Sequence, residues 1–93
     1  MSNSTATVGA YGPFTTELDE EAKIAFSEAI EQIVGVDYVP LAVAKQIVSG
    51  TNYAFFCNAK TVAPGATSHP AMVSVYKPLK GGAGVTHIER LPY

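Results

Sequence analysis

The side chains best suited to covalent or metal chemistry in this chain of 93 residues are Cys57, His69 and His87. A cysteine nucleophile needs a histidine to take its proton, and either histidine could approach Cys57 in a fold. Cys57 alternates with Phe55 in a strand-like stretch, which favours the other interpretation, a buried and inert thiol. The histidines have no cysteine or carboxylate at metal-ligand spacing, so we expect surface histidines and no metal site. We also expect no cofactor and no enzyme, since no cluster of acid, base and nucleophile is evident.

A different kind of chemistry, the binding of apolar surface, is indicated by Gln46-Ile47-Val48-Ser49-Gly50 and the following Thr51-Asn52-Tyr53. A glycine lies here between two strand-like stretches, and Gly, Thr and Asn are typical of a tight reversal or bulge. The pattern predicts a β-hairpin tip with Ile47 and Val48 exposed, which is costly unless the tip meets a partner. The alternative is structural: Gly50 forms a bulge, Val48 packs inward and Gln46 is solvated.

A helix is predicted ahead of this tip. Thr16 is the expected N-cap, with Asp19 three residues later, and Gly35 is the expected C′ residue. The apolar residues at helical spacing form one stripe: Leu18, Ala22, Ala25, Phe26, Ala29, Ile30 and Ile33.

After the helix, the hydrophobic period changes to two, which predicts strands. The first strand starts at Pro40, and its Ala42 and Ala44 are expected on the face that the helix covers closely. The others are expected at 53–60, 71–77 and 85–91, with a loop at 61–70 and a flexible, glycine-rich hairpin at 78–84. This order predicts an α+β fold in which one N-terminal helix packs across a four-stranded antiparallel sheet.

Length and composition limit the function classes. The chain is long enough for one domain, expected at 15–93, after a flexible N-terminal arm at 1–14. A net charge of −2 with scattered basic residues gives no electrostatic basis for binding nucleic acid or a membrane surface. No apolar run approaches the ~20 residues of a membrane span. The absence of a signal-peptide pattern and the single cysteine favour a cytoplasmic protein, although a secreted protein without its leader would share these features.

Residues Gln46–Gly50 match the Gln-x-Val-x-Gly signature of the cystatin superfamily of cysteine protease inhibitors, and Thr51-Asn52-Tyr53 is similar to the continuation in stefins. The order of helix and strands resembles the cystatin architecture over nearly the whole chain. Residues 8–14, Val-Gly-Ala-Tyr-Gly-Pro-Phe, resemble the opening of plant cystatins. The second hairpin has Pro78-Leu79, where secreted cystatins have Pro-Trp and stefins Leu-Pro. The lack of the secreted members' disulfide cysteines favours a stefin-like or microbial version.

The resemblance implies a reversible, non-covalent inhibitor of papain-like cysteine proteases. The segments that would form its binding wedge are Val8 and Gly9 in the arm, Gln46, Ile47, Val48, Ser49 and Gly50 in the first hairpin, and Pro78 and Leu79 in the second. A monomer is expected, with a domain-swapped dimer as an alternative because the hairpin at 48–50 is a natural hinge. A non-inhibitory protein-binding module on the same fold is the alternative function. Joint replacement Val48→Asp and Gly50→Arg is expected to abolish inhibition and leave the fold intact.

Overall fold

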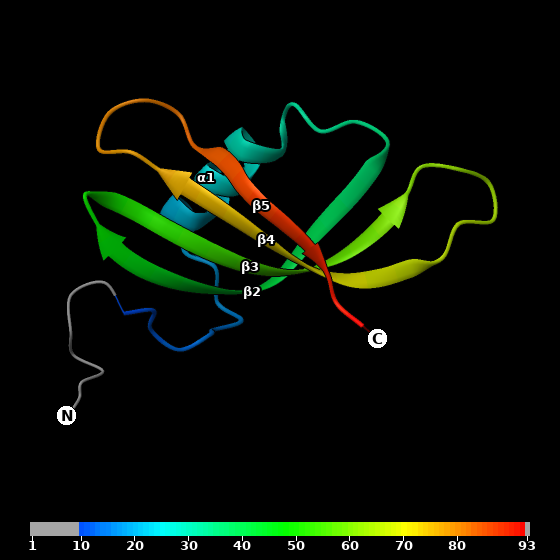
Figure 1. Cartoon of the computed structure of the whole chain (residues 1–93), viewed down its shortest axis with the longest axis horizontal. Coiled ribbons are helices and arrows are strands. Elements are labelled where there is room, and N and C mark those ends of the chain that lie inside the picture. Colours follow the sequence, from blue (N-terminus) through cyan, green and yellow to red (C-terminus); the bar gives the residue numbers. More distant parts are fainter. Residues whose placement is uncertain (1–9, 93) are drawn as a thin grey trace.

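One helix packs on a four-stranded antiparallel sheet (Figure 1). The structure, a computed structural model, describes residues 10–92. In chain order the elements are α1 (Glu20–Ile30), β2 (Val36–Val48), β3 (Gly50–Thr61), β4 (Ser68–Lys77) and β5 (Gly84–Arg90). The sheet order β2-β3-β4-β5 means that each strand pairs with its neighbour in sequence. The predicted α+β class and its antiparallel sheet are therefore confirmed.

The helix begins later than the sequence pattern predicted. Its N-cap is Asp19, whose Oδ1 accepts a hydrogen bond from the backbone N of Ala22 at 2.8 Å. The prediction of Thr16 as N-cap is wrong: the chain is still non-helical between Thr16 and Asp19, and the residue before Thr16, Thr15, exchanges two backbone hydrogen bonds of 2.9 Å with Val43 of β2.

The helix also ends earlier than predicted. Its C-cap is Glu31, and Gly35 lies four residues further on, so Gly35 is not the C′ residue. The carbonyl oxygen of Gly35 instead accepts a hydrogen bond from the backbone N of Val62 at 2.9 Å. This bond joins the connection between α1 and β2 to the residue that follows β3. It lies next to the Val36–Thr61 pair, the last pair between β2 and β3 at this end of the sheet.

The core lies between α1 and the sheet. Phe26 of α1 meets Phe55 of β3 edge to face, with ring centroids 4.8 Å apart, and Tyr53 stacks on the same Phe55. The buried cluster consists of Ala22, Ala25, Phe26 and Ala29 from the helix and Val43, Tyr53, Phe55, Cys57, Val73 and Val75 from the sheet. The alanines of the helix stripe bring its axis close to the sheet, which lets the larger strand side chains fill the space between them.

The face of β2 that meets the helix differs from the predicted one. Val43 belongs to the buried cluster, whereas Ala44 lies on the opposite face and pairs with Ala54 of β3. A β-bulge between Pro40 and Ala42 shifts the register within the strand. The expectation that the β2 alanines face the helix is therefore wrong. The small residues that permit close approach of the helix to the sheet are the alanines of the helix itself.

The two ends of the sheet carry different connections. The β2–β3 turn at Ser49 and the β4–β5 loop at 78–83 lie at one end, on the left of Figure 1. The α1–β2 connection and the β3–β4 loop at 62–67 lie at the other end. Antiparallel pairing of neighbouring strands produces this arrangement, because alternate turns return to the same end of the sheet.

Candidate protein-binding site

The turn between β2 and β3 presents apolar side chains to solvent. Val48 pairs directly with Gly50, so the reversal occurs at Ser49. Ile47 is 62% exposed and Val48 is 38% exposed. The predicted hairpin tip is present, and Val48 does not pack inward as the structural alternative required.

Gly50 packs against the end of β4. It is buried and has φ of +103°, a left-handed conformation that favours glycine. A Cβ atom at this position would lie 2.5 Å from the carbonyl oxygen of Lys77 and 2.9 Å from the hydroxyl oxygen of Tyr76. The expectation that Gly50→Arg leaves the fold intact is therefore wrong. Gly50 has a structural role, but it is not the bulge of the structural alternative, because the pairing of β2 with β3 shifts register between Pro40 and Ala42 and not at Gly50.

Two further hydrogen bonds hold the turn. Nδ2 of Asn52 donates to Oε1 of Gln46 at 2.8 Å, and these two residues are direct partners across the hairpin. The hydroxyl of Tyr76, on β4, donates to the carbonyl oxygen of Ser49. The turn is thus bound both within its own hairpin and by the next strand, and its exposed apolar side chains have a fixed support.

Pro78 and Leu79 lie at the same end of the sheet. Lys77, the last residue of β4, pairs with Thr51, which directly follows Gly50. The Cα of Pro78 lies only 3.1 Å from where a Cβ of Gly50 would stand, and Leu79 is 76% exposed. The structure therefore brings together residues 46–50 and Pro78-Leu79, a surface that we call the hairpin end.

The expected arm anchors, Val8 and Gly9, lie outside the described residues. The stretch that follows them runs antiparallel to β2 along its outer edge, where the backbone N of Gly12 donates to the carbonyl oxygen of Lys45 at 2.9 Å. From Thr15 back to Gly12 the chain runs towards the hairpin end (Figure 1). The last residues of the predicted arm at 1–14 are thus bound to the sheet.

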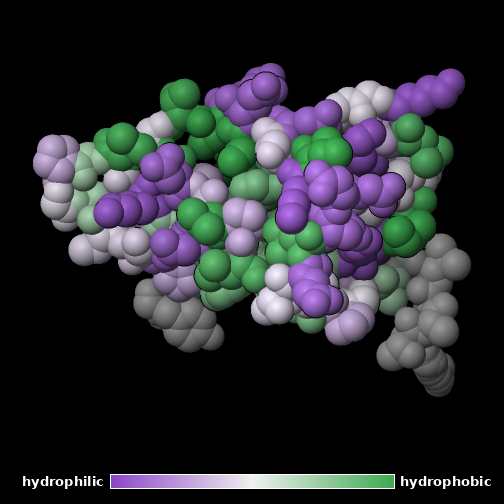
Figure 2. All heavy atoms as spheres, turned by 180° about the vertical axis from the view of Figure 1, so that it is seen from behind, coloured by the Kyte–Doolittle hydropathy of each residue, from purple (hydrophilic) through white to green (hydrophobic). Residues whose placement is uncertain are grey.

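Sequence reasoning missed residues that shape the hairpin end. Ile24 of α1 is 49% exposed and, together with Thr51 and Leu79, lines a hollow of about 350 Å³. The signal for Ile24 is an apolar side chain outside the helix stripe. Tyr76 has no such signal, because its partner Ser49 is 27 residues away. In the reverse view of Figure 2, hydrophobic side chains are visible at the right-hand end, where both hairpins lie, as well as at the centre and the left of the same face.

The residues suited to covalent chemistry are not assembled into a site. Cys57 is fully buried, its Sγ donates to the carbonyl oxygen of Phe55 at 3.6 Å, and desolvation raises the pKa of its thiol to about 12. His69 pairs with Ala59, whereas His87 pairs with Ser74, so the two histidines are on opposite faces of the sheet. Within residues 10–92, no three His, Cys, Asp or Glu side chains gather in a way that could hold a metal ion.

Comparison of the chain with protein-family models, with curated proteins and with solved structures finds no match. In the described part of the chain, no helix has the length and apolar character needed to cross a membrane.

Proposed function

We propose that the protein is a reversible, non-covalent inhibitor of papain-like cysteine proteases on a cystatin-like fold, with the hairpin end as its binding surface. One observation carries the proposal: Ile47 and Val48 are exposed at a turn that is held in place beside the exposed Leu79. An apolar edge with a preformed shape suits a slot-like active site, because little conformational entropy is lost when the two associate.

The resemblance to cystatins supports the same partner. The residues that match the family signature, Gln46–Gly50, form the tip of the first hairpin, and Pro78-Leu79 begins the second. These are the hairpins that cystatins use in their wedge. Val8 and Gly9, which precede the stretch bound to β2, are the proposed third segment.

Inhibition requires no chemical step from this protein. The turn fills the cleft and covers the catalytic thiol of the protease. The carbonyl oxygen of Ser49 already accepts a hydrogen bond from the Tyr76 hydroxyl, and the backbone reverses direction at Ser49. A protease cleaves an extended peptide, so this turn blocks the cleft without presenting a peptide bond in the form of a substrate.

The size of the apolar surface is sufficient for useful affinity. Burial of Val8, Ile47, Val48 and Leu79, at ~1.5–3 kcal/mol each, provides roughly 6–12 kcal/mol before the costs of association. We therefore expect dissociation constants between micromolar and nanomolar. Loss of one anchor should weaken binding by about 10- to 100-fold.

Titration of papain and a small panel of related proteases with the full chain tests the proposal. The double replacement Val48→Asp and Leu79→Asp places charge on the hairpin end and should weaken inhibition by at least about 100-fold. Val34→Asp is the matched control, because Val34 is 88% exposed and lies in the connection at the opposite end of the sheet. This control should inhibit like the unmodified chain.

Full protease activity at a high micromolar concentration of the folded chain would contradict the proposal. The hairpin end would then belong to a non-inhibitory protein-binding module. Light scattering on the same samples would distinguish the expected monomer from a domain-swapped dimer formed through the hinge at 48–50.

A further inference from the structure

The loop at 78–83 between β4 and β5 is bound at both ends by side chains from neighbouring elements. Its glycines predict a flexible hairpin. At its start, however, Nζ of Lys77 donates to the carbonyl oxygens of Pro78 at 3.2 Å and of Gly81 at 2.7 Å. The Lys77 side chain thus links two carbonyl groups of the loop, one before Leu79 in the sequence and one after it.

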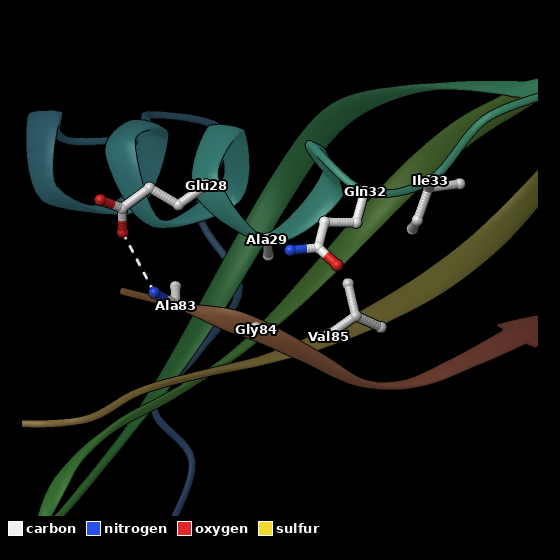
Figure 3. Close-up of a pocket in the computed structure, with 7 residues that line it drawn as sticks. All are labelled: Glu28, Ala29, Gln32, Ile33, Ala83, Gly84 and Val85. Carbon is white, nitrogen blue, oxygen red and sulfur yellow. Dashed lines mark hydrogen bonds between the residues drawn. The ribbon is translucent and has the colours of Figure 1, made fainter. Parts of the chain in front are cut away.

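The far side of the same loop is bound by the helix. The backbone N of Ala83 donates to Oε1 of Glu28 at 3.1 Å, a contact between residues 55 positions apart in the sequence. Figure 3 shows the Glu28 carboxylate extending from α1 towards Ala83 at the border of a hollow lined by Gln32 and Val85. The next helix residue, Ala29, is buried in the core, so Glu28 is attached to a rigid element.

We propose that Glu28 and Lys77 are positioning residues of the hairpin end, an inference that rests on the inhibitory function proposed above. They restrict the loop so that Leu79 already stands beside the first hairpin before a protease arrives. Each hydrogen bond is exposed or only partly buried and is weak by itself. Their effect comes from the loop they restrict, because ordering a glycine-rich segment only upon binding reduces affinity.

A role in positioning differs from a role in stability. Glu28 is exposed, and its bond lies outside the buried cluster, so removing its carboxylate should leave global unfolding nearly unchanged. If Glu28 acts through Leu79, its removal should matter only while the leucine side chain is present. This dependence can be measured with a double-mutant cycle.

The experiment measures inhibition of papain by Glu28→Ala, Glu28→Gln, Leu79→Ala and the Glu28→Ala/Leu79→Ala double variant. We expect Glu28→Ala to weaken inhibition by about 3- to 10-fold. Glu28→Gln keeps an oxygen acceptor and should restore most of the loss. In the Leu79→Ala background, Glu28→Ala should have little further effect. Glu31→Ala removes another exposed helix carboxylate and should inhibit like the unmodified chain.

Lys77 and the free loop provide two more measurements. Lys77→Met keeps the apolar stem without the ammonium group and should also weaken inhibition by about 3- to 10-fold. In the free protein, amide hydrogen exchange at Ala83 should become about 3- to 10-fold faster in Glu28→Ala than in Glu28→Gln.

Each outcome bears on one of the two proposals. If the unmodified chain inhibits and Glu28→Ala inhibits equally well, the positioning role is wrong while the inhibitory function stands. An equal loss with and without Leu79 also overturns it, because Glu28 would then not act through the leucine. If the unmodified chain fails to inhibit the proteases, the proposed function falls and the positioning role falls with it.

Discussion

Gly50 lies directly against the carbonyl oxygen of Lys77, and this contact joins the tips of the two hairpins. A Cβ atom on Gly50 would approach that oxygen to 2.5 Å. Besides its part in the β2–β3 turn, Gly50 therefore permits the start of β3 to lie in contact with the end of β4. The relative position of Ile47 and Leu79, the two most exposed apolar residues of the hairpin end, depends on this approach.

Gly50→Ala should lower the free energy of unfolding by about 2–4 kcal/mol, because it combines a strained φ with a contact that the backbone cannot relieve locally. Chemical denaturation measures this loss. Gly65→Ala is the matched control: Gly65 also has positive φ, +75°, but apart from its chain neighbours no heavy atom lies within 4 Å of its Cβ position. A cost at Gly50 no larger than at Gly65 would show that the contact with Lys77 is unimportant.

Tyr76→Phe should weaken inhibition of papain by about 3- to 10-fold, because the Ser49 carbonyl loses its hydrogen bond and the turn gains freedom. The ring remains, so the free energy of unfolding should fall by only about 0.5–1.5 kcal/mol. Tyr38→Phe, in β2 near the opposite end of the sheet, is the control and should not change inhibition. Equal inhibition by both variants would contradict a role for the Tyr76 hydroxyl in shaping the turn.

The Asp19–Lys45 pair should make stability depend on pH. Nζ of Lys45 lies 2.6 Å from Oδ2 of Asp19. This hydrogen bond, together with the one from Ala22 N, holds the pKa of Asp19 below its ordinary value. Because the folded pKa is the lower one, the stabilisation is present above the ordinary carboxyl pKa of about 3.9 and is lost as pH falls through the folded pKa.

Asp19→Asn tests this assignment, since Asn still caps the helix but cannot pair with an ammonium group. Both partners are substantially exposed, 38% for Lys45 and 49% for Asp19, so we expect a loss of only about 0.2–1 kcal/mol at neutral pH. Unfolding measured between pH 2 and 7 should show a smaller acid loss in this variant. Asp37→Asn, which replaces an exposed aspartate at the start of β2, is the control for the substitution itself at neutral pH.

Cys57 should resist thiol reagents in the folded protein. Burial removes the sulfur from solvent and raises the pKa of the thiol to about 12, so the reactive thiolate is scarce at pH 8. Labelling with a disulfide reagent should therefore follow the rate of unfolding and become fast in denaturant. Rapid labelling in native buffer would mean that β3 opens locally or that the thiol is accessible.

Much of the fold was predictable because its signals are local. The stripe of Ala22, Ala25, Phe26 and Ala29 has helical spacing, and these four residues are buried in the core. Alternating apolar residues predicted the strands, and Gly50, Thr51 and Asn52 predicted the reversal between two of them, which occurs at Ser49. Such patterns depend on neighbours within a few residues, so they can be recognised without knowledge of the tertiary structure.

The tertiary structure decided where these elements begin and what holds the hairpin end. Thr15 is paired with Val43, and the helix begins only after its N-cap Asp19. The bonds of Tyr76 to Ser49 and of Glu28 to Ala83 join residues 27 and 55 positions apart. The residue types alone contain no sign of these contacts, because the partners meet only when the sheet has formed and the helix has packed on it. The sequence by itself thus determined the elements and the apolar tip, whereas the folded chain determined which side chains hold that tip in place.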